Sequence, residues 1–252
     1  MESEQVFNNE ILKIRDWISK IPESKKAVML VSGGYDSIVT SARLVKDFDM
    51  ELFPIYFDRG ARNREAELQS IAFYTQYIQN KYGKNKFHNV FIPKINIPPT
   101  EIKQNLQEYA KTHSYPMRDV IMIMYAVQYA VSLGEDVRTI CNGMLVNDFE
   151  SSLALNRINT LSILNMTREK DWNILSINLD TEVCKKTFRK RDEILWAQAN
   201  DFDDSQTITC WTPQTIGNKF YHCGKCSACL ERKEEFVASK ALDKTLYIQE
   251  NK

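Results

Sequence analysis

A buried strand that runs directly into a glycine-rich turn restricts the fold of this chain more than any other feature. Residues 27–31 read Ala-Val-Met-Leu-Val, a continuously apolar run typical of a strand covered on both faces of a sheet. Ser32-Gly33-Gly34-Tyr35-Asp36-Ser37 follows at once, and helical spacing of apolar residues begins at Asp36. Two glycines let the backbone turn sharply, and a helix that starts there points its free amides and partial positive charge at the turn. The pattern predicts a strand-turn-helix unit that binds an anion.

Predicted strands and helices alternate along most of the sequence. Parallel strands need long crossover connections, and helices of the predicted length provide them. We therefore expect an α/β fold with a Rossmann-like parallel sheet flanked by helices. The expected strands are 27–31, 52–57, 87–92, 139–142 and 173–179, and the expected helices are 7–18, 36 onward, 64–81, 117–133 and 185–200.

The sequence changes character after residue 200, where short irregular segments rich in Cys, Gly and polar residues begin. A length of 252 residues suits one large domain with a small appended module. We expect the sheet domain to occupy residues 1–200 and the module to occupy 201–252. With 43% hydrophobic and 26% charged residues, the chain has enough apolar side chains for a substantial core.

Charge and hydropathy exclude several classes of protein. The 33 basic residues balance the 33 acidic ones, so no overall field attracts nucleic acid or an anionic membrane, and we expect neither as a partner. The longest uncharged stretch, 120–134, is shorter than the roughly 20 apolar residues that cross a bilayer. Residues 1–10 carry acids and amides where a secretory signal would be basic and then apolar. We expect a cytoplasmic protein.

Four of the six cysteines are spaced as metal ligands. Cys210, Cys223, Cys226 and Cys229 read Cys-x12-Cys-x2-Cys-x2-Cys, and Gly224 lets the backbone fold tightly between them. Four thiolates close a tetrahedral Zn²⁺ site and leave no position open for substrate, so we predict a structural role. An iron–sulfur cluster is the main alternative, and the adjacent His222 could replace one cysteine. Cys141 and Cys184 lie in apolar surroundings and are expected to be packing residues.

The turn at residues 32–37 resembles the Ser-Gly-Gly-x-Asp-Ser pyrophosphate loop of the ATP pyrophosphatase superfamily. The resemblance implies a domain that cleaves ATP between its α and β phosphates. By this likeness Ser32, Gly33, Gly34, Tyr35 and Ser37 belong to the nucleotide site, and Asp36 helps to hold Mg²⁺. The expected chemistry is adenylation of an organic acid.

Together, the turn and the cysteine module resemble the QueC family of 7-cyano-7-deazaguanine synthases over nearly the whole chain. Phe57 to Arg64, Asn142 to Asp148 and His222 to Arg232 are similar to three further segments of that family. The resemblance implies that ATP activates the carboxylate of 7-carboxy-7-deazaguanine, that ammonia displaces AMP, and that a second round gives the nitrile. It also places Gly143 at the nucleotide and suggests a homodimer.

Two arginines are candidates for binding triphosphate or carboxylate, because the planar guanidinium matches both oxyanions. The two candidates are Arg62 and Arg118. We expect the neighbouring Arg64 to be a solvated surface residue. The sequence departs from the family where Asn63 and Ala61 replace its His and Gln, and where Asp119 replaces its Asn. Its Tyr-Pro-Asp-Cys-Arg stretch is also absent, replaced by residues 149–153.

These departures leave three hypotheses open. The first is a divergent nitrile synthase. The second is a QueC-like enzyme that couples the activated deazaguanine to another amine, on a protein, as paralogues do in some antiphage defence systems. The third is a zinc-ribbon module that binds RNA or a partner protein and keeps a decayed nucleotide fold. The basic run 185–191 is expected to be one solvated helix face, or alternatively to close over phosphates.

Overall fold

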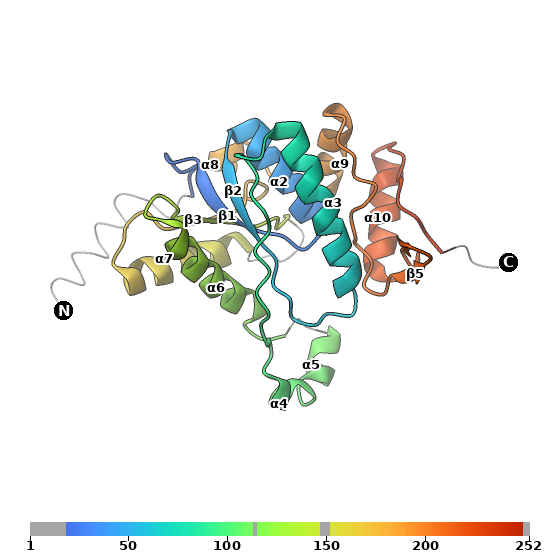
Figure 1. Cartoon of the computed structure of the whole chain (residues 1–252), viewed down its shortest axis with the longest axis horizontal. Coiled ribbons are helices and arrows are strands. Elements are labelled where there is room, and N and C mark those ends of the chain that lie inside the picture. The colour runs from blue at the N-terminus through green and yellow to red at the C-terminus, as the bar shows by residue number, and fades with distance from the viewer. Residues whose placement is uncertain (1–18, 113–114, 147–151, 249–252) are drawn as a thin grey trace.

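The computed structural model describes residues 19–112, 115–146 and 152–248. Four parallel strands form the central sheet: β1 (Lys26–Leu30), β2 (Glu51–Ile55), β3 (Thr139–Cys141) and β4 (Asn173–Leu175). Their order is β2-β1-β3-β4, so the chain crosses from one side of β1 to the other between β2 and β3 (Figure 1). The α/β prediction is confirmed, and the turn after β1 lies at the point where ligands commonly bind to such sheets.

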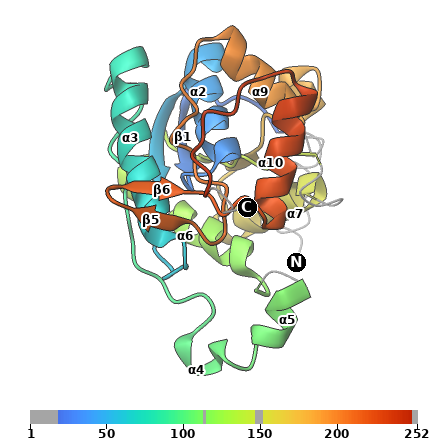
Figure 2. The ribbon, with the colours of Figure 1, turned by 90° about the vertical axis from the view of Figure 1, so that its right-hand side faces the viewer.

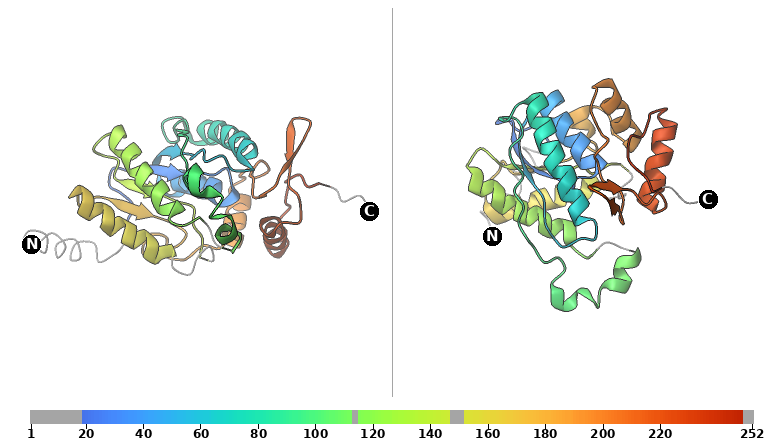
Figure 3. Two further views of the ribbon diagram at one scale, coloured as in Figure 1. Left: turned by 90° about the horizontal axis from the view of Figure 1, so that it is seen from below. Right: turned by 45° about the vertical axis from the view of Figure 1, so that its right-hand side comes forward.

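Helices cover both faces of the sheet, as alternation along β1 requires. Ala27 and Met29 pack in one core with α2 and α3, whereas Val28 packs in a second core with residues of α6 and α7. Figure 3 shows α6 and α7 on the opposite side of the strands from α3. The helices are α2 (Tyr35–Phe48), α3 (Arg64–Tyr82), α4 (Thr100–Lys103), α5 (Gln107–Thr112), α6 (Arg118–Leu133), α7 (Ser152–Thr167), α8 (Thr181–Cys184), α9 (Lys190–Ala199) and α10 (Ser227–Ala238).

The predicted strand 87–92 is wrong, because this segment pairs with β2 only through isolated bridges, such as Leu52 with Phe87 and Ile55 with Phe91. Leu52 N–H donates to the Lys86 carbonyl, and the Leu52 carbonyl accepts from His88 N–H, as a parallel ladder requires. Pro54, two residues on, has no N–H to continue the ladder. The segment therefore runs beside β2 as extended chain.

Two other predicted elements are shorter in the structure. The strand predicted at 173–179 ends at Leu175, and the helix predicted at 185–200 begins only at Lys190. Lys185 has a φ of +63°, in the left-handed region, which separates α9 from the short α8. The predicted helix 7–18 lies outside the described residues.

The C-terminal segment packs beside α2, α3 and α9. It contains a two-stranded antiparallel hairpin, β5 (Gln214–Ile216) and β6 (Lys219–Tyr221), followed by α10. Figure 2 shows this hairpin beside α3 and α10 standing next to α9. The division of the chain at residue 200 stays a prediction. No helix in the described ranges has the length and apolarity needed to span a membrane.

Candidate active site

Hydroxyl groups fold the turn 32–37 around itself. Ser37 Oγ accepts from Ser32 N–H at 3.1 Å and donates to the Gly34 carbonyl at 3.1 Å, while Gly34 N–H donates to Ser32 Oγ at 3.2 Å. Gly34 is the N-cap of α2, and no side chain among the described residues caps this end of the helix. The first amides of a helix have no acceptor within it, so the start of α2 remains able to bind an anion.

Close backbone contacts explain the glycines of the site. Gly33 has a φ of +73°, and a Cβ there would lie 2.7 Å from the Glu67 carbonyl oxygen. Gly143 follows β3 and crosses the start of α2, where a Cβ would lie 2.9 Å from Ser37 Cα. The prediction that Gly143 belongs to this site therefore has a geometric basis, because only a residue without a side chain lets the two backbones approach so closely.

Tyr35 has a different role from its predicted one. Its side chain is buried, its hydroxyl donates to Asp204 Oδ2 at 3.2 Å, and its ring meets the edge of Phe236 at 5.7 Å. Tyr35 thus anchors the turn to the C-terminal segment instead of offering its side chain to a nucleotide. Its backbone amide remains in the first turn of α2.

Asp36 faces a second carboxyl that the sequence did not indicate. Its Oδ2 lies 3.6 Å from Lys190 Nζ, and its buried Oδ1 has no hydrogen-bond partner. Glu193 of α9 is fully buried: its Oε1 accepts from Thr40 Oγ1 at 2.9 Å and Asn178 Nδ2 at 3.1 Å, while Oε2 has no partner. The two carboxyls are close enough to interact directly, and each has one oxygen without a hydrogen bond of good geometry.

The environment raises the pKa of both acids. Burial, and then the Asp36 charge, raise the pKa of Glu193 well above its usual range. Burial also raises the pKa of Asp36, although the Lys190 cation opposes this shift. Such a pair favours either a shared proton or a bound cation. Carboxylate oxygens are the ligands that Mg²⁺ prefers, so Asp36 and Glu193 fit the predicted Mg²⁺.

The basic run 185–191 does not form one helix face. Lys190 is the first helical residue of α9 and pairs with Asp36 and with Glu231 Oε1 at 3.3 Å. Lys186 precedes the helix and pairs with Asp192 at 3.1 Å, whereas Arg191 pairs with a residue of α10. Of these basic residues only Lys190 pairs with the turn, and the alternative in which this region closes over phosphates stays a prediction.

A basic cavity of about 550 Å³ lies between the loop after β2 and the excursion formed by α4 and α5. Arg62 lines it, as do three residues that the sequence did not single out, Arg59, Lys103 and Tyr115. Arg118 does not line this cavity, and its Nε donates to Asp119 Oδ1 at 2.7 Å. The structure thus separates the two predicted arginines.

Arg64 follows the loop after β2, and its side chain is 36% exposed, as expected of a surface residue. It also makes an ion pair that the sequence did not indicate, because its Nε donates to Asp58 Oδ1 at 2.8 Å. This guanidinium, opposed by partial desolvation, holds the pKa of Asp58 below its usual range. Asp58 also accepts from Gly60 N–H at 3.3 Å, so the ion pair fixes the start of the loop that carries Arg59 and Arg62.

The four predicted cysteines come together at the start of α10. Their sulfur atoms all lie within 4.8 Å of one another, and the Sγ atoms of Cys223 and Cys229 are 4.0 Å apart. A regular tetrahedron with Zn–S bonds of about 2.3 Å has edges of about 3.8 Å, so the donor set fits Zn²⁺. Burial raises the pKa of Cys210, and the hydrogen bond that Cys223 N–H donates to Cys210 Sγ at 3.2 Å opposes this shift. The identity of the metal stays a prediction.

His222 lies outside this cluster. Its ring is fully buried, and burial together with the Arg232 charge lowers its pKa to about 4. The alternative in which His222 replaces a cysteine is therefore not supported by the placement of the four sulfur atoms. Cys141 is completely buried, which raises the pKa of its thiol, and Cys184 Sγ donates to backbone carbonyls. Cys141 is therefore a packing residue as expected, whereas Cys184 is half-buried among backbone carbonyls.

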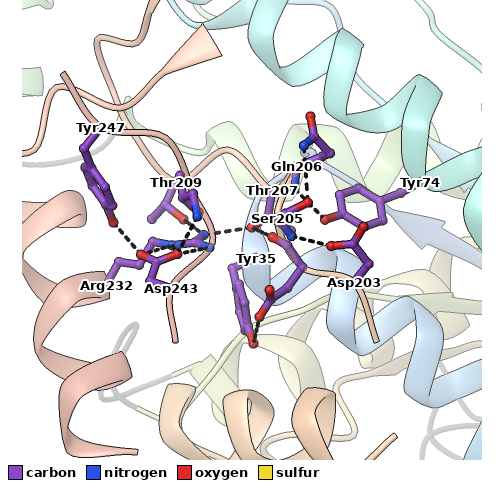
Figure 4. A network of polar contacts seen from close by, with 12 residues as sticks. Tyr35, Tyr74, Asp203, Ser205, Gln206, Thr207, Thr209, Arg232, Asp243 and Tyr247 are labelled. Carbon is purple, nitrogen blue, oxygen red and sulfur yellow. Dashed lines mark hydrogen bonds and ion pairs between the residues drawn. The ribbon is translucent and has the colours of Figure 1, made fainter. Parts of the chain in front are cut away.

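Arg232, the last residue of the cysteine motif, holds the C-terminal segment to the turn (Figure 4). Its guanidinium is 1% exposed, pairs with Asp243 at 3.1 Å, and donates to Thr207 Oγ1 at 2.8 Å. It also lies 5.2 Å from the ring centre of Tyr35. The arginine therefore links the cysteine module to the first helical residue after the turn.

Comparisons with known proteins agree with these features. A 7-cyano-7-deazaguanine synthase 1 from Sulfurisphaera tokodaii is 28% identical over 231 residues, which cover 88% of this chain and 98% of that protein. The 7-cyano-7-deazaguanine synthase of Methanocaldococcus jannaschii is 26% identical over 253 residues, covering 89% and 100%. Among solved structures, the U34-tRNA thiolase NcsA from Methanococcus maripaludis has a TM-score of 0.44 at 16% identity, over 79% of this chain and 65% of that one.

One family model covers most of the chain. It is described as "Queuosine biosynthesis protein QueC" and matches residues 26–240, from the first residue of β1 to just beyond α10. The matched region includes the turn, Gly143, Glu193 and all four clustered cysteines. The chain therefore belongs to the QueC family.

Proposed function

We propose that this chain is an ATP-dependent enzyme that adenylates the carboxylate of a 7-deazaguanine acid and couples it to an amine, releasing AMP and pyrophosphate. Membership of the QueC family supports the substrate class. The observation that carries the proposal is the uncapped start of α2 beside the turn 32–37, which offers amides to phosphate oxygens. Asp36 and Glu193 would hold Mg²⁺, and the four clustered cysteines would hold a structural Zn²⁺.

The proposed chemistry places developing charge next to these groups. A carboxylate oxygen attacks the α phosphorus of ATP, the bond to the bridging oxygen breaks, and pyrophosphate leaves with the electron pair. An amine nitrogen then attacks the acyl carbon, AMP leaves, and the nitrogen loses a proton to give the amide. Lys190 and the first amides of α2 would stabilise the departing pyrophosphate. The basic cavity with Arg59, Arg62 and Lys103 would orient the acid.

The acceptor is either ammonia or an amine on a protein. With ammonia, the amide oxygen attacks the α phosphorus of a second ATP and displaces pyrophosphate, and loss of AMP and two protons from the adenylated amide then gives the nitrile. The Tyr-Pro-Asp-Cys-Arg stretch expected from the QueC resemblance is replaced at residues 149–153, and this departure is the reason to test an acceptor other than ammonia. We propose protein conjugation, as in an antiphage system, as the second candidate, and a homodimer as the assembly.

The test is to incubate the purified protein with ATP, Mg²⁺, 7-carboxy-7-deazaguanine and ammonium, and to measure nucleotides and deazaguanine products by mass spectrometry. We expect AMP and pyrophosphate only when the acid is present. Nitrile supports the ammonia reaction, and AMP without nitrile supports the other acceptor. ADP in place of AMP, or no acid-dependent turnover, would reject the proposal.

A pair of serine variants provides the control. Ser37→Ala removes the hydroxyl that joins Ser32 to Gly34, and we expect it to lower AMP formation by about tenfold or more. Ser41→Ala lies one turn further along α2, where the hydroxyl only donates to the Ser37 carbonyl at 2.7 Å. It should retain activity close to that of the unmodified enzyme.

A further inference from the structure

A second cavity lies between α3 and the C-terminal segment, away from the groups assigned above. Its volume is about 240 Å³, and its walls come from the amino-terminal half of α3, residues 205–208, β6 and residues 244–246. Figure 2 shows the β5–β6 hairpin beside α3, where Gln69 Nε2 donates to the Asn218 carbonyl at 3.3 Å. No residue of the turn 32–37 lines this cavity.

Two buried polar side chains line the cavity with their hydrogen-bonding atoms poorly satisfied. His222 is 0% exposed, and neither ring nitrogen makes a hydrogen bond of good geometry among the described residues, although the Thr207 backbone lies near the ring. Thr245 is 8% exposed, and its Oγ1 likewise makes none of good geometry, although it lies near the Asp243 carboxyl. A buried polar atom left unpaired costs roughly 1–3 kcal/mol, so two such residues around one cavity indicate that something polar occupies it.

The charge around the cavity is positive. Lys219 and Lys244 line it, and both side chains are exposed. Lys244 also attracts the Asp204 carboxyl, which does not line the cavity. No acidic residue is among the lining side chains. Ser70 and Thr207 also line the cavity, but their hydroxyls already donate to backbone carbonyls. Ser205 Oγ accepts from Gln206 Nε2, so its own proton can be donated to an oxygen atom.

The wall of the cavity is connected to the turn. Ser70 Oγ donates to the Gly33 carbonyl at 2.8 Å, and Ile208 N–H donates to the same oxygen at 2.9 Å. Ser70 and Ile208 both line the cavity. An occupant would therefore contact the two residues that hold the back of the turn.

We propose that this cavity binds a small oxyanion, the phosphate or carboxylate group of a ligand, between Lys219, Lys244, His222 and Thr245. The site is separate from the proposed ATP site and does not depend on the proposed reaction. Ammonium groups supply the charge, and the buried imidazole and hydroxyl supply the directed hydrogen bonds. By holding Ser70 and Ile208, the bound anion would stabilise the turn.

Calorimetric titration of the full chain with inorganic phosphate, and separately with acetate, at constant ionic strength tests this proposal. The Lys219→Gln/Lys244→Gln variant should bind the anion at least about tenfold more weakly. Lys84→Gln/Lys94→Gln, which removes two exposed lysines elsewhere, should bind as the unmodified protein does. Phosphate binding without acetate binding identifies a phosphate ligand, and the reverse identifies a carboxylate.

A crystal soaked in phosphate distinguishes this site from the turn. We expect density between His222 and Lys244, and its loss in the lysine variant while any anion at the turn remains. Thr245→Val, which removes only a hydroxyl, should weaken binding in a chain whose zinc content is unchanged. Water alone in the cavity at saturating phosphate, or equal affinity in both lysine double variants, would overturn the proposal.

Discussion

Gly33 is the residue whose replacement tests the geometry of the turn most directly. Its φ of +73° costs any L-residue about 1–2 kcal/mol. A Cβ would also meet the Glu67 carbonyl at 2.7 Å, and that oxygen belongs to the backbone of α3 and cannot move away cheaply. We expect Gly33→Ala to lower the free energy of unfolding by about 3 kcal/mol and to abolish ATP binding, measured by urea denaturation and calorimetry.

Gly217 provides the matched control for this strain. Its φ is +61°, and a Cβ there meets nothing within 4 Å. Gly217→Ala should therefore carry the conformational cost alone, about 1 kcal/mol, and leave ATP binding intact. Equal losses in the two variants would mean that the contact with α3 does not matter.

Glu193 predicts a dependence of stability on pH. Burial and the Asp36 charge raise the pKa of Glu193, so the folded protein holds its proton more tightly than the unfolded chain does. The stability from such a group is present at low pH and is lost as the pH rises through the raised pKa. Glu193→Gln, which stays neutral, should become more stable relative to the unmodified protein as pH rises from about 5 to 8 in urea titrations without Mg²⁺.

Two controls accompany this pH experiment: addition of Mg²⁺, and a variant of an exposed acidic residue. If Asp36 and Glu193 hold the ion, Mg²⁺ should stabilise the unmodified protein at the higher pH and have a smaller effect on Glu193→Gln. Glu234→Gln, an exposed position on α10, should show no trend with pH. A difference between Glu193→Gln and the unmodified protein that does not vary with pH would contradict the raised pKa.

At the scale of single residues, the sequence predicted the groups whose role depends on local backbone. Gly33 and Gly34 follow a buried strand, and the four clustered cysteines are close in sequence, so short-range spacing was enough to identify them as candidate site residues. Glu193 and Tyr35 were missed or misplaced because their roles depend on partners more than 150 residues away, Asp36 in one case and Asp204 in the other. Nothing in the local pattern distinguishes a buried Glu of α9 from a surface one.

Among the elements, the positions along the chain of the four sheet strands and of the long helices followed from apolar periodicity. The order of the strands within the sheet and the segment at its edge did not. The extended segment 87–92 has strand composition, but Pro54 in the neighbouring strand removes the N–H it would need. The excursion formed by α4 and α5 carries few buried residues, so periodicity could not show that it closes a cavity over Arg59 and Arg62.

This excursion predicts a specific effect on substrate binding. Lys103 ends α4 and reaches the basic cavity, so its charge should contribute to holding the acid but not to the chemistry at phosphorus. We expect Lys103→Gln to raise KM for the acid by about tenfold or more, as for one charge-assisted hydrogen bond, with little change in kcat. Steady-state AMP formation measures both constants, and Lys84→Gln, far from this cavity, is the control. A change in kcat alone would assign Lys103 another role.

On the scale of the whole molecule, the cysteine module and the sheet share one buried ion pair. Arg232 and Asp243 lie 3.1 Å apart, and Arg232 also contacts Tyr35 and Thr207. The guanidinium holds the pKa of Asp243 low against the opposing effect of burial. The cysteine module and the sheet with its turn 32–37 should therefore unfold in one cooperative transition, because neither can unfold without exposing this ion pair. Metal release and loss of the turn's structure should then coincide.

Asp243→Asn should separate the two parts. Removing one charge leaves Arg232 buried and uncompensated, which costs about 3–5 kcal/mol. We expect metal release, followed with a colorimetric chelator, to occur at lower urea than loss of tryptophan fluorescence, whereas the two transitions coincide in the unmodified protein. Arg191→Gln breaks an exposed pair with Glu235 and should change stability by less than about 1 kcal/mol. Coincident transitions in Asp243→Asn would show that contacts other than this ion pair, such as Tyr35 with Phe236, join the module to the sheet.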